Sequence, residues 1–333
     1  MKSKFKGYYK PLPEDFAKIW DDCIFVFDTN VLYDFYRYSD DTVDLLFTIF
    51  EKIKDKIWIP HWVGIEYHRG LEDRIREQVG KYSDAIKDLN SFSEKIKTQR
   101  EHPFLSVELQ KEIEEFYVKF NQELTTQKSK LKNLIIENPV KERIADLIGE
   151  NIGDSLTKEE EEQIVKIGDE RLSNNIPPGY VDYKVKKSRP GLDKYGDYII
   201  WQQILKEAKA KKKSFIFVTF DTKEDWYKII KFNRTDIRIG PRPELAEEFL
   251  AIDGCSLWLY PTPEFIEYAV KHLNIEVDAS RLVKVKQETA LPLDNNTNSE
   301  CASEIKNENE NIGDISAISI GATSSNSSEA SGT

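Results

Sequence analysis

The residues with the clearest chemical potential in this 333-residue sequence are four carboxylates that a parallel α/β sheet would gather at one edge. Asp28 and Asp221 each end an apolar, strand-like run, Glu66 follows a third such run, and Asp197 lies in the first turn of a predicted helix. Two unit charges about 4 Å apart repel by roughly 4 kcal/mol at an effective dielectric of about 20. A cation or bound protons must therefore neutralise such a cluster, and this indicates a divalent-metal site with a polyanionic substrate.

Metal-assisted hydrolysis of a phosphodiester suits this set of ligands. The reaction needs an activated water and a positive charge that stabilises the negative charge developing on oxygen. Two divalent ions about 3.5–4 Å apart can supply both, and Mg²⁺ prefers oxygen ligands while keeping several waters. No histidine ligand is required, and Thr29 and Asn30 can orient the neighbouring Asp28 or a bound water.

The elements that must position these carboxylates alternate between strand and helix patterns. Apolar runs predict strands at Cys23–Phe27, Ile57–Pro60, Ser214–Phe220 and Ser256–Tyr260. Helical patterns cover Asp41–Ile53, Val63–Leu71, Asp197–Ala210, Glu244–Phe249 and Pro263–Leu273. This alternation predicts an α/β fold with a mostly parallel central sheet. Because ligands of such sheets bind beyond the carboxyl ends of the strands, residues far apart in the sequence can share one site.

The pattern also predicts four segments. Residues 1–71 and 176–283 are expected to form the two parts of the α/β domain. Between them, the charged stretch 72–175 has apolar residues at helical spacing with a break at His102-Pro103, which predicts a helical insert of two long helices followed by shorter pieces. Residues 284–333 are rich in Asn, Ser and Glu, with too few apolar residues to offset the entropy of ordering, so we expect a disordered tail.

The charge of the chain argues mildly against a general nucleic-acid coat protein, because phosphate binding favours positive charge. The formal net charge is -11, of which the predicted tail, with 3 basic and 8 acidic residues, contributes -5. The remaining -6 includes the four carboxylates, whose charge bound divalent ions would offset.

Composition and cysteine use favour a cytoplasmic protein. The chain has no apolar run long enough to span a membrane, and its basic N-terminus is not followed by the apolar stretch of a secretory signal. Its three cysteines, Cys23, Cys255 and Cys301, fit neither a zinc pattern nor a disulfide framework.

Taken in order, the segments around the four carboxylates resemble the PIN domain family (PilT N-terminus nucleases), and more narrowly its bacterial PIN-like group with a long helical insert. They read F-V-F-D-T-N-V-L, W-I-P-H-W-V-G-I-E-Y-H-R, Y-G-D-Y-I-I-W and F-V-T-F-D-T-K-E-D-W, and the stretches I-P-P-G-Y-V-D and G-P-R-P-E-L resemble the same group. The resemblance covers roughly residues 20–270 and implies a three-layer, Rossmann-like domain.

The resemblance also implies a nuclease that depends on Mg²⁺ or Mn²⁺ and acts on nucleic acid, with RNA favoured, as an endoribonuclease. It implies that Asp28 is the first metal ligand, Glu66 the acid on the following helix, Asp197 the acid at the start of a later helix, and Asp221 the acid after the next strand. Asp225 is a further candidate ligand that could equally cap the next helix.

Two groups of basic residues could bind phosphates or could be solvated loop charges. The first group, before Asp197, contains Lys184, Lys186, Lys187 and Arg189, and the second, after the Asp221 strand, contains Arg234, Arg238 and Arg242.

Other functions remain open at this point. A phosphatase of the haloacid dehalogenase type needs a second aspartate two residues after the first, and Asn30 occupies that position. A structure-specific DNA nuclease of the flap type is a closer alternative, since the insert could serve as a helical arch. A third class is a non-catalytic module that binds nucleic acid or docks a partner. The insert could bind a protein partner, and the chain could form a homo-oligomer.

Overall fold

A central parallel sheet organises the part of the chain that the computed structural model describes, which is residues 1, 5–9, 13–97, 104–233 and 235–290. Its strands are β1 (Ile24–Phe27), β2 (Phe215–Val218) and β5 (Leu257–Tyr260), in the order β1-β2-β5. Both strand pairings are parallel, with Phe27 beside Val218 and Val218 beside Tyr260. The predicted α/β fold with a parallel sheet is thus confirmed.

The remaining elements surround this sheet. The helices are α1 (Pro13–Asp22), α2 (Thr29–Asp34), α3 (Asp40–Ile53), α4 (His61–Lys97), α5 (Val107–Asn133), α6 (Pro139–Ile148), α7 (Lys158–Ser173), α8 (Tyr180–Lys186), α9 (Gly196–Lys211), α10 (Pro243–Leu250), α11 (Thr262–His272) and α12 (Ala279–Thr289). Short 3-10 turns lie at Lys6–Tyr8, Lys54–Lys56 and Asp193–Tyr195, and strands β3 (Tyr227–Phe232) and β4 (Thr235–Pro241) form a separate antiparallel pair.

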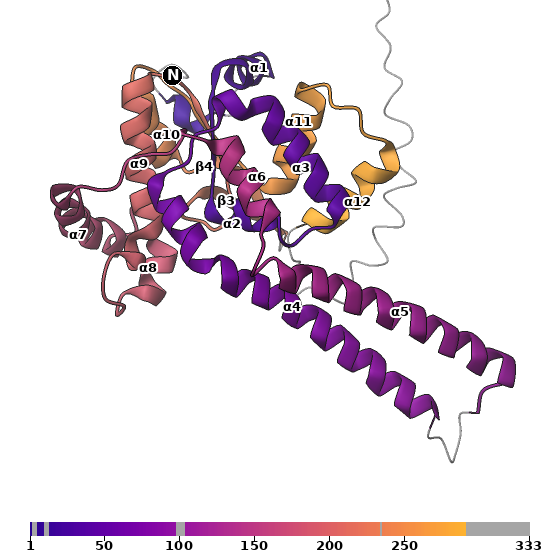
Figure 1. Ribbon diagram of the computed structural model, residues 1–333. Coiled ribbons are helices and arrows are strands. Elements are labelled where there is room, and N and C mark those ends of the chain that lie inside the picture. The colour runs from indigo at the N-terminus through magenta and orange to yellow at the C-terminus, as the bar shows by residue number, and fades with distance from the viewer. Residues whose placement is uncertain (2–4, 10–12, 98–103, 234, 291–333) are drawn as a thin grey trace, which may run out of the picture. The chain divides into compact units, whose positions relative to one another are not determined.

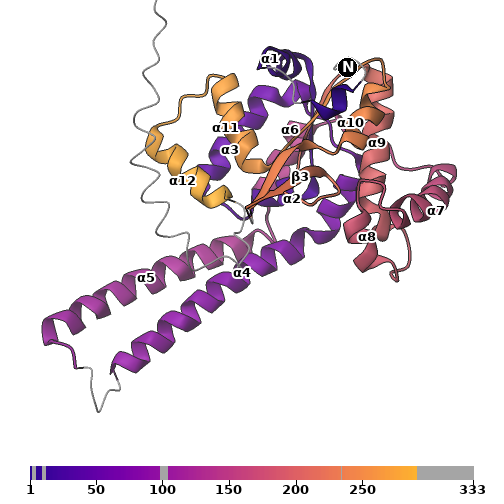
Figure 2. The ribbon, with the colours of Figure 1, turned by 180° about the vertical axis from the view of Figure 1, so that it is seen from behind.

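Every residue of the three strands is buried, because helices cover both faces of the sheet. On one face, the ring of Phe27 stacks on Phe50 of α3 and meets Phe265 of α11 edge-on. On the other face, Phe215 packs against Phe249 of α10. Figures 1 and 2 show α3 and α11 together, with α9 and α10 on the opposite side. Such three-layer burial explains the continuous apolar runs of the strands.

The predicted strand Ile57–Pro60 takes part in the sheet only through single bridges. Ile57 pairs with Phe25, and Ile59 pairs with Ile152. The backbone N–H of Trp58 donates to Phe25 O at 2.9 Å, and that of Gly153 donates to Ile59 O at 2.8 Å. The pairing ends at Pro60, which has no N–H to donate, and α4 begins at the next residue.

The long helices α4 and α5 run side by side and extend away from the other helices (Figures 1 and 2). The buried apolar residues of α4 all lie at or before Ile75, and α5 buries none of its residues. The predicted helical insert is therefore present as this hairpin. Within the described ranges, no helix is both long and apolar enough to cross a membrane.

The segment after α5, which the sequence analysis assigns to the insert, packs on the core. Ile144 of α6, together with Ile164 and Leu172 of α7, is buried in the main hydrophobic cluster, and Ile152 supplies an edge bridge of the sheet. Residues beyond 138 thus contribute to the body as well as linking its two parts. The insert boundaries at residues 72 and 175 stay a prediction.

The antiparallel pair of β3 and β4 is an element that the sequence analysis does not predict. Only Tyr227 and Pro241, at its base, are buried, while Ile230, Phe232 and Ile237 are exposed. Because the ribbon lies outside the core, its sequence shows neither a continuous apolar run nor a clean alternation of apolar and polar residues.

The predicted start of the tail at residue 284 falls inside α12, so this boundary has to be moved beyond Thr289. Val285 is 1% exposed. The carboxylate of Glu288 accepts hydrogen bonds from the backbone and hydroxyl of Ser39 and from the hydroxyl of Thr42, at 3.1, 2.9 and 2.7 Å. These contacts join α12 to residues that are distant from it in the sequence, and they stabilise a helix whose own composition is mostly polar. The tail residues from 291 onward lie outside the described residues.

A chain that ends at residue 283 should melt about 5–10 °C below one that ends at residue 290. The loss combines the burial of Val285, worth about 2 kcal/mol, with the hydrogen bonds of Glu288, worth about 1–3 kcal/mol, at a few degrees per kcal/mol. Differential scanning calorimetry of both chains and of the full chain measures this. Equal melting temperatures for the two truncated chains would show that α12 contributes nothing to stability.

Candidate active site

Asp28 follows β1 directly and caps the N-terminus of α2. Its Oδ1 accepts a hydrogen bond from the backbone N–H of Thr29 at 2.7 Å. Its Oδ2 accepts hydrogen bonds from the hydroxyl of Thr219 at 2.7 Å and from the side-chain amide of Asn30 at 3.3 Å. Both oxygens are thus held in fixed directions, and Asn30 is one of the groups that contact them, while its supporting role stays a prediction.

Two threonines connect the carboxylates at the carboxyl ends of the strands. The buried hydroxyl of Thr219, one residue after β2, donates to Asp28 and also accepts the backbone N–H of Asp221 at 3.0 Å. The hydroxyl of Thr29 donates to Glu66 Oε2 at 2.8 Å. The sequence analysis names Thr29 but misses Thr219, although F-V-T-F-D shows a hydroxyl two residues before the acid.

Glu66 projects from the second turn of α4 toward the start of α9. Its Oε1 accepts a hydrogen bond from the indole N–H of Trp62 at 2.9 Å. A Cβ added to Gly196 would lie 2.9 Å from this same oxygen, so any larger residue before Asp197 would displace the Glu66 carboxylate from its present position. Burial raises the pKa of Glu66, against the opposing effect of its hydrogen bonds.

Asp197 lies in the first turn of α9, as predicted. A Cβ added to Gly179, whose φ is +90°, would lie 2.8 Å from the Asp197 Cβ, so the turn before α8 packs directly on this side chain. Burial, followed by the charges of Asp221 and Asp28, raises the pKa of Asp197 well above its usual range. The fields of three sequence-distant carboxylates therefore overlap at this edge of the sheet.

Asp221 is bound to a lysine that the sequence analysis misses. The backbone N–H of Lys223 donates to Asp221 Oδ1 at 3.0 Å, and its ammonium donates to Oδ2 at 2.7 Å. The same ammonium also donates to Asp182 of α8. Asp182 and Lys223 stand in the I-P-P-G-Y-V-D and F-V-T-F-D-T-K-E-D-W stretches, so the signal was visible, but neither residue is one of the acids matched to the family.

Asp225 lies beside this network and is 1% exposed. Its Oδ2 accepts the backbone N–H of Val181 at 3.0 Å, so it ties the start of α8 to the segment after β2. Its Oδ1 is buried without a hydrogen-bond partner among the described residues. Burial raises the pKa of Asp225, and the charge of Asp221 adds to that rise.

The ligand set fits a hard divalent cation by its chemistry, since it consists of carboxylate oxygens and includes the unpartnered buried Oδ1 of Asp225. Its geometry is not that of a closed cage. In the part of the chain that the structure describes, no group of three or more His, Cys, Asp or Glu side chains is arranged to hold a metal ion. The carboxylates are instead directed by hydrogen bonds from threonine, tryptophan and lysine.

The first basic group contributes one residue to the site. The ammonium of Lys186 donates to Asp182 at 2.6 Å, and its charge lowers the pKa of Glu66 against the larger effect of burial. Lys184, Lys187 and Arg189 are exposed. Lys184 and Lys187 lie over the rings of Tyr180 and Tyr183, respectively.

Of the second basic group, Arg238 lies in β4 and Arg242 directly follows that strand, at the start of α10. Arg238 lies 3.6 Å from Glu264, whereas Arg242 is paired with Glu244 at 2.6 Å and donates to Glu224 O at 3.3 Å. Arg242 is therefore tied down at the base of the ribbon. Arg234 lies outside the described residues.

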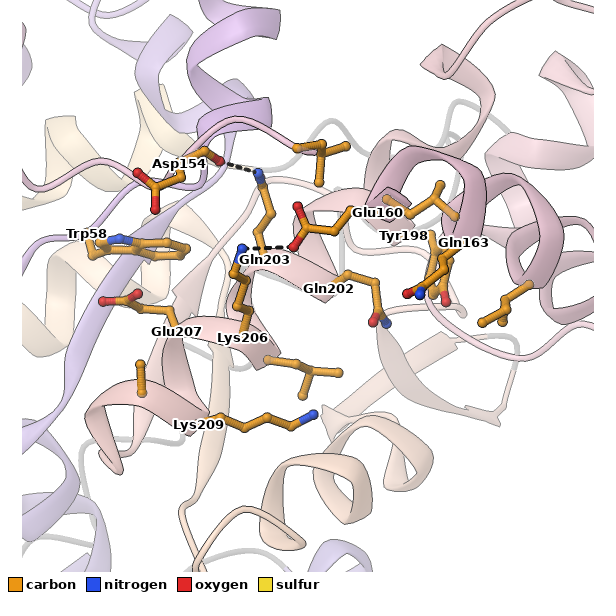
Figure 3. Close-up of a pocket in the computed structure, with 16 residues that line it drawn as sticks. Trp58, Asp154, Glu160, Gln163, Tyr198, Gln202, Gln203, Lys206, Glu207 and Lys209 are labelled. Carbon is orange, nitrogen blue, oxygen red and sulfur yellow. Dashed lines mark hydrogen bonds and ion pairs between the residues drawn. The ribbon is translucent and has the colours of Figure 1, made fainter. Parts of the chain in front are cut away.

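A groove of about 700 Å³ lies between α7 and α9, and Figure 3 shows its lining. None of the four carboxylates lines it. Gln203 connects the groove to the site, because its side chain accepts the backbone N–H of Trp62 at 3.0 Å and donates to Asp154 O at 3.3 Å. This contact fixes the start of α4, which carries Glu66, against α9.

Comparison with known proteins finds a matching family. Residues 24–245 match a family described as a PIN-like domain, which covers most of the described chain and all four carboxylates. Neither a curated protein nor a solved structure matches the chain.

Replacing Asp28 by asparagine should stabilise the protein at pH 8 and have less effect near pH 4. Burial raises the pKa of Asp28 to about 7 from 3.8, so the folded chain holds this proton over a range in which the unfolded chain has released it. The free energy of unfolding therefore falls as pH rises from about 4 to about 7. Asp28→Asn removes that dependence and should gain on the order of 1–3 kcal/mol at pH 8.

Urea unfolding of both chains at pH 4.5, 6 and 8, with EDTA, measures the difference. Asp22→Asn serves as a control because Asp22 is an exposed carboxylate paired with Lys213, and a partner lowers its pKa out of this range. A constant difference between the Asp28 variant and the native chain across this pH range would contradict the buried-carboxylate interpretation.

Proposed function

Because the chain belongs to the PIN-like domain family, a nuclease-type fold, we propose that it is a metal-dependent nuclease that hydrolyses RNA internally. The observation that carries this proposal is the overlap of charge among Asp28, Asp197 and Asp221 at the carboxyl edge of the sheet. A fold that merely scaffolds would gain stability by replacing Asp28 or Asp197, since both are buried and repelled by neighbouring carboxylates. The presence of these destabilising acids is explained if they bind divalent cations.

The proposed roles follow from the contacts of each side chain. Asp28, Glu66, Asp197 and Asp221 would hold Mg²⁺ or Mn²⁺, with Asp225 as a further ligand. The bound ion would supply positive charge at the scissile phosphate and acidify a water. Thr219 and Asn30 fix the direction of Asp28. Thr29 and Trp62 do the same for Glu66, so the ligands are oriented before substrate arrives.

The β3–β4 ribbon supports a single-stranded nucleic acid as the substrate. Its two strands carry the exposed apolar residues Ile230, Phe232 and Ile239 together with the basic Lys228, Lys231 and Arg238. Aromatic and basic side chains together suit a strand with unpaired bases, because every base has a face that can stack and every nucleotide a phosphate. Burial raises the pKa of Tyr227 at the base of the ribbon, and the charges of Glu264, Asp221 and Asp28 add to that rise, so the base of the ribbon lies within electrostatic range of the carboxylates.

Two alternatives each rest on the α4–α5 hairpin. In a flap-type DNA nuclease the hairpin would act as the arch that guides the strand. As a docking element, it offers the exposed rings of Phe92, Phe116 and Phe120, the last two stacked 5.5 Å apart, to a protein partner or a second copy of the chain. We favour RNA cleavage as the activity and partner binding as the role of the hairpin, in a cytoplasmic setting.

Asp197→Asn should lower cleavage of end-labelled single-stranded RNA by roughly 100-fold or more, because it removes a carboxylate that the cation needs. The assay compares Mg²⁺, Mn²⁺ and EDTA and includes a flap DNA substrate. Asp154→Asn, at an exposed acid that lines the α7–α9 groove, is the matched control and should cleave like the native chain.

Cleavage that survives EDTA would contradict a metal-dependent mechanism. Preferential cutting of the flap DNA would favour the DNA nuclease. Binding of RNA without cleavage under any metal condition would favour the non-catalytic module.

Lys231→Glu combined with Phe232→Ala should weaken RNA binding about tenfold or more and reduce its salt dependence. One phosphate contact accounts for a slope of about 0.7 in log K against log salt for single strands, and one stacked base for about 1–3 kcal/mol. Fluorescence anisotropy at several salt concentrations, with EDTA to prevent turnover, measures both quantities.

The control for this experiment is Lys212→Glu, which removes an exposed lysine paired with Asp253 at 2.8 Å. If both variants bind alike at every salt concentration, the substrate lies elsewhere on the surface.

A further inference from the structure

A row of four side chains of alternating charge runs from the carboxylate cluster to α8. It begins at Asp221, passes through the ammonium of Lys223 to Asp182, and ends at Lys186. Within this row of charges, Asp182 accepts hydrogen bonds from both lysines. Burial raises the pKa of Asp182, but these hydrogen bonds outweigh burial and leave its pKa below the usual range. Asp182 therefore stays ionised and holds two ammonium groups beside the site.

Lys223 is the most exposed member of this row of charges. Its side chain is 40% exposed, whereas that of Asp221 is only 11% exposed. Because solvent reaches the lysine end of this ion pair, the pair is weaker than a fully buried one, and Lys223 can exchange partners. Its ammonium sits on a flexible stem with three donor hydrogens, which suits it to exchange one anionic oxygen for another.

The position of Lys223 conflicts with the proposed role of Asp221. A divalent cation that takes Asp221 as ligand competes with the ammonium for the same Oδ2, and the doubly charged ion repels the ammonium. Lys223 must then find another anion within reach. Asp182 still anchors it, and a phosphate bound next to the cation would present free anionic oxygens at the same place.

We propose that Lys223 is a phosphate-binding residue that changes partners: its ammonium neutralises Asp221 until a divalent cation binds there, and it then contacts a phosphate of the substrate strand. The inference rests on the proposed function and adds to it a residue that couples metal binding to substrate binding. Lys186, held by the other oxygen of Asp182, stays in place and keeps Asp182 ionised.

The coupling gives Lys223→Gln two effects of opposite sign. Mn²⁺ affinity, measured by titration calorimetry without RNA, should rise about threefold or more, because the competing ammonium is gone. RNA affinity in Ca²⁺, at conditions where no product forms, should fall about fivefold or more, with the salt slope reduced by about 0.7. RNA affinity in EDTA should stay within twofold of the native chain, since Lys223 then remains on Asp221.

Two further variants calibrate the measurement. Lys223→Arg keeps the charge and should retain most of the Ca²⁺-dependent RNA affinity. Lys213→Gln removes a lysine of similar exposure, 45% against 40% for Lys223, from its ion pair with Asp22 at 2.6 Å, and should match the native chain in all three measurements.

A purely structural salt bridge predicts a different result for Lys223→Gln: weaker Mn²⁺ binding and an equal loss of RNA affinity in EDTA and in Ca²⁺. Either observation would overturn the inference and leave the proposed function standing. Failure of the proposed function is recognised separately, because the native chain itself would then bind no Mn²⁺ and cut no RNA.

Discussion

Repulsion among buried carboxylates is the constraint on which the site depends. Burial alone raises the pKa of Asp28, and the charges of Glu66 and Asp221 raise it further. Ionising such a group at neutral pH costs on the order of a few kcal/mol, which is a large share of the 5–15 kcal/mol that a typical domain has available. The surroundings limit this cost with donors: hydroxyls from Thr29 and Thr219, and an ammonium from Lys223.

The fold can hold these carboxylates together because the elements around the site are fixed by contacts between uncharged side chains. Each sheet strand is fully buried between aromatic side chains on both faces, so the ends that carry Asp28 and Thr219 cannot separate. Glycine then allows the helices to close in. A side chain at Gly196 would collide with Glu66, and one at Gly179 would collide with Asp197. Packing therefore sets the spacing of the acids, and the hydrogen bonds only aim them.

The features that could be predicted from the sequence are those that leave a local pattern. The parallel strands are buried on both faces and read as apolar runs, and the carboxyl-edge rule brings Asp28 and Asp221 together. Lys223 and Asp182 could not be assigned, because their pairing depends on how α8 lies against the segment after β2, 41 residues away. The β3–β4 ribbon and the full extent of α12 could not be predicted for a related reason. The ribbon is stabilised by hydrogen bonds between its strands, and α12 by Glu288 contacting Ser39, so neither carries an apolar pattern of its own.

The distribution of charge also resolves an apparent conflict between an acidic chain and a polyanionic substrate. The acids that repel one another lie at the carboxyl edge of the sheet, where bound cations would reverse the sign of the electrostatic potential. The exposed cations of the ribbon and of α8 lie on elements that border this edge, joined to it through Tyr227 and Asp182. A nucleic acid approaching without metal would meet carboxylates backed by lysine, whereas one approaching a metal-loaded site would meet positive charge from both sources. Under the proposed function, net charge is therefore a poor guide to this protein, because bound cations and not composition would set the sign of the potential at the site.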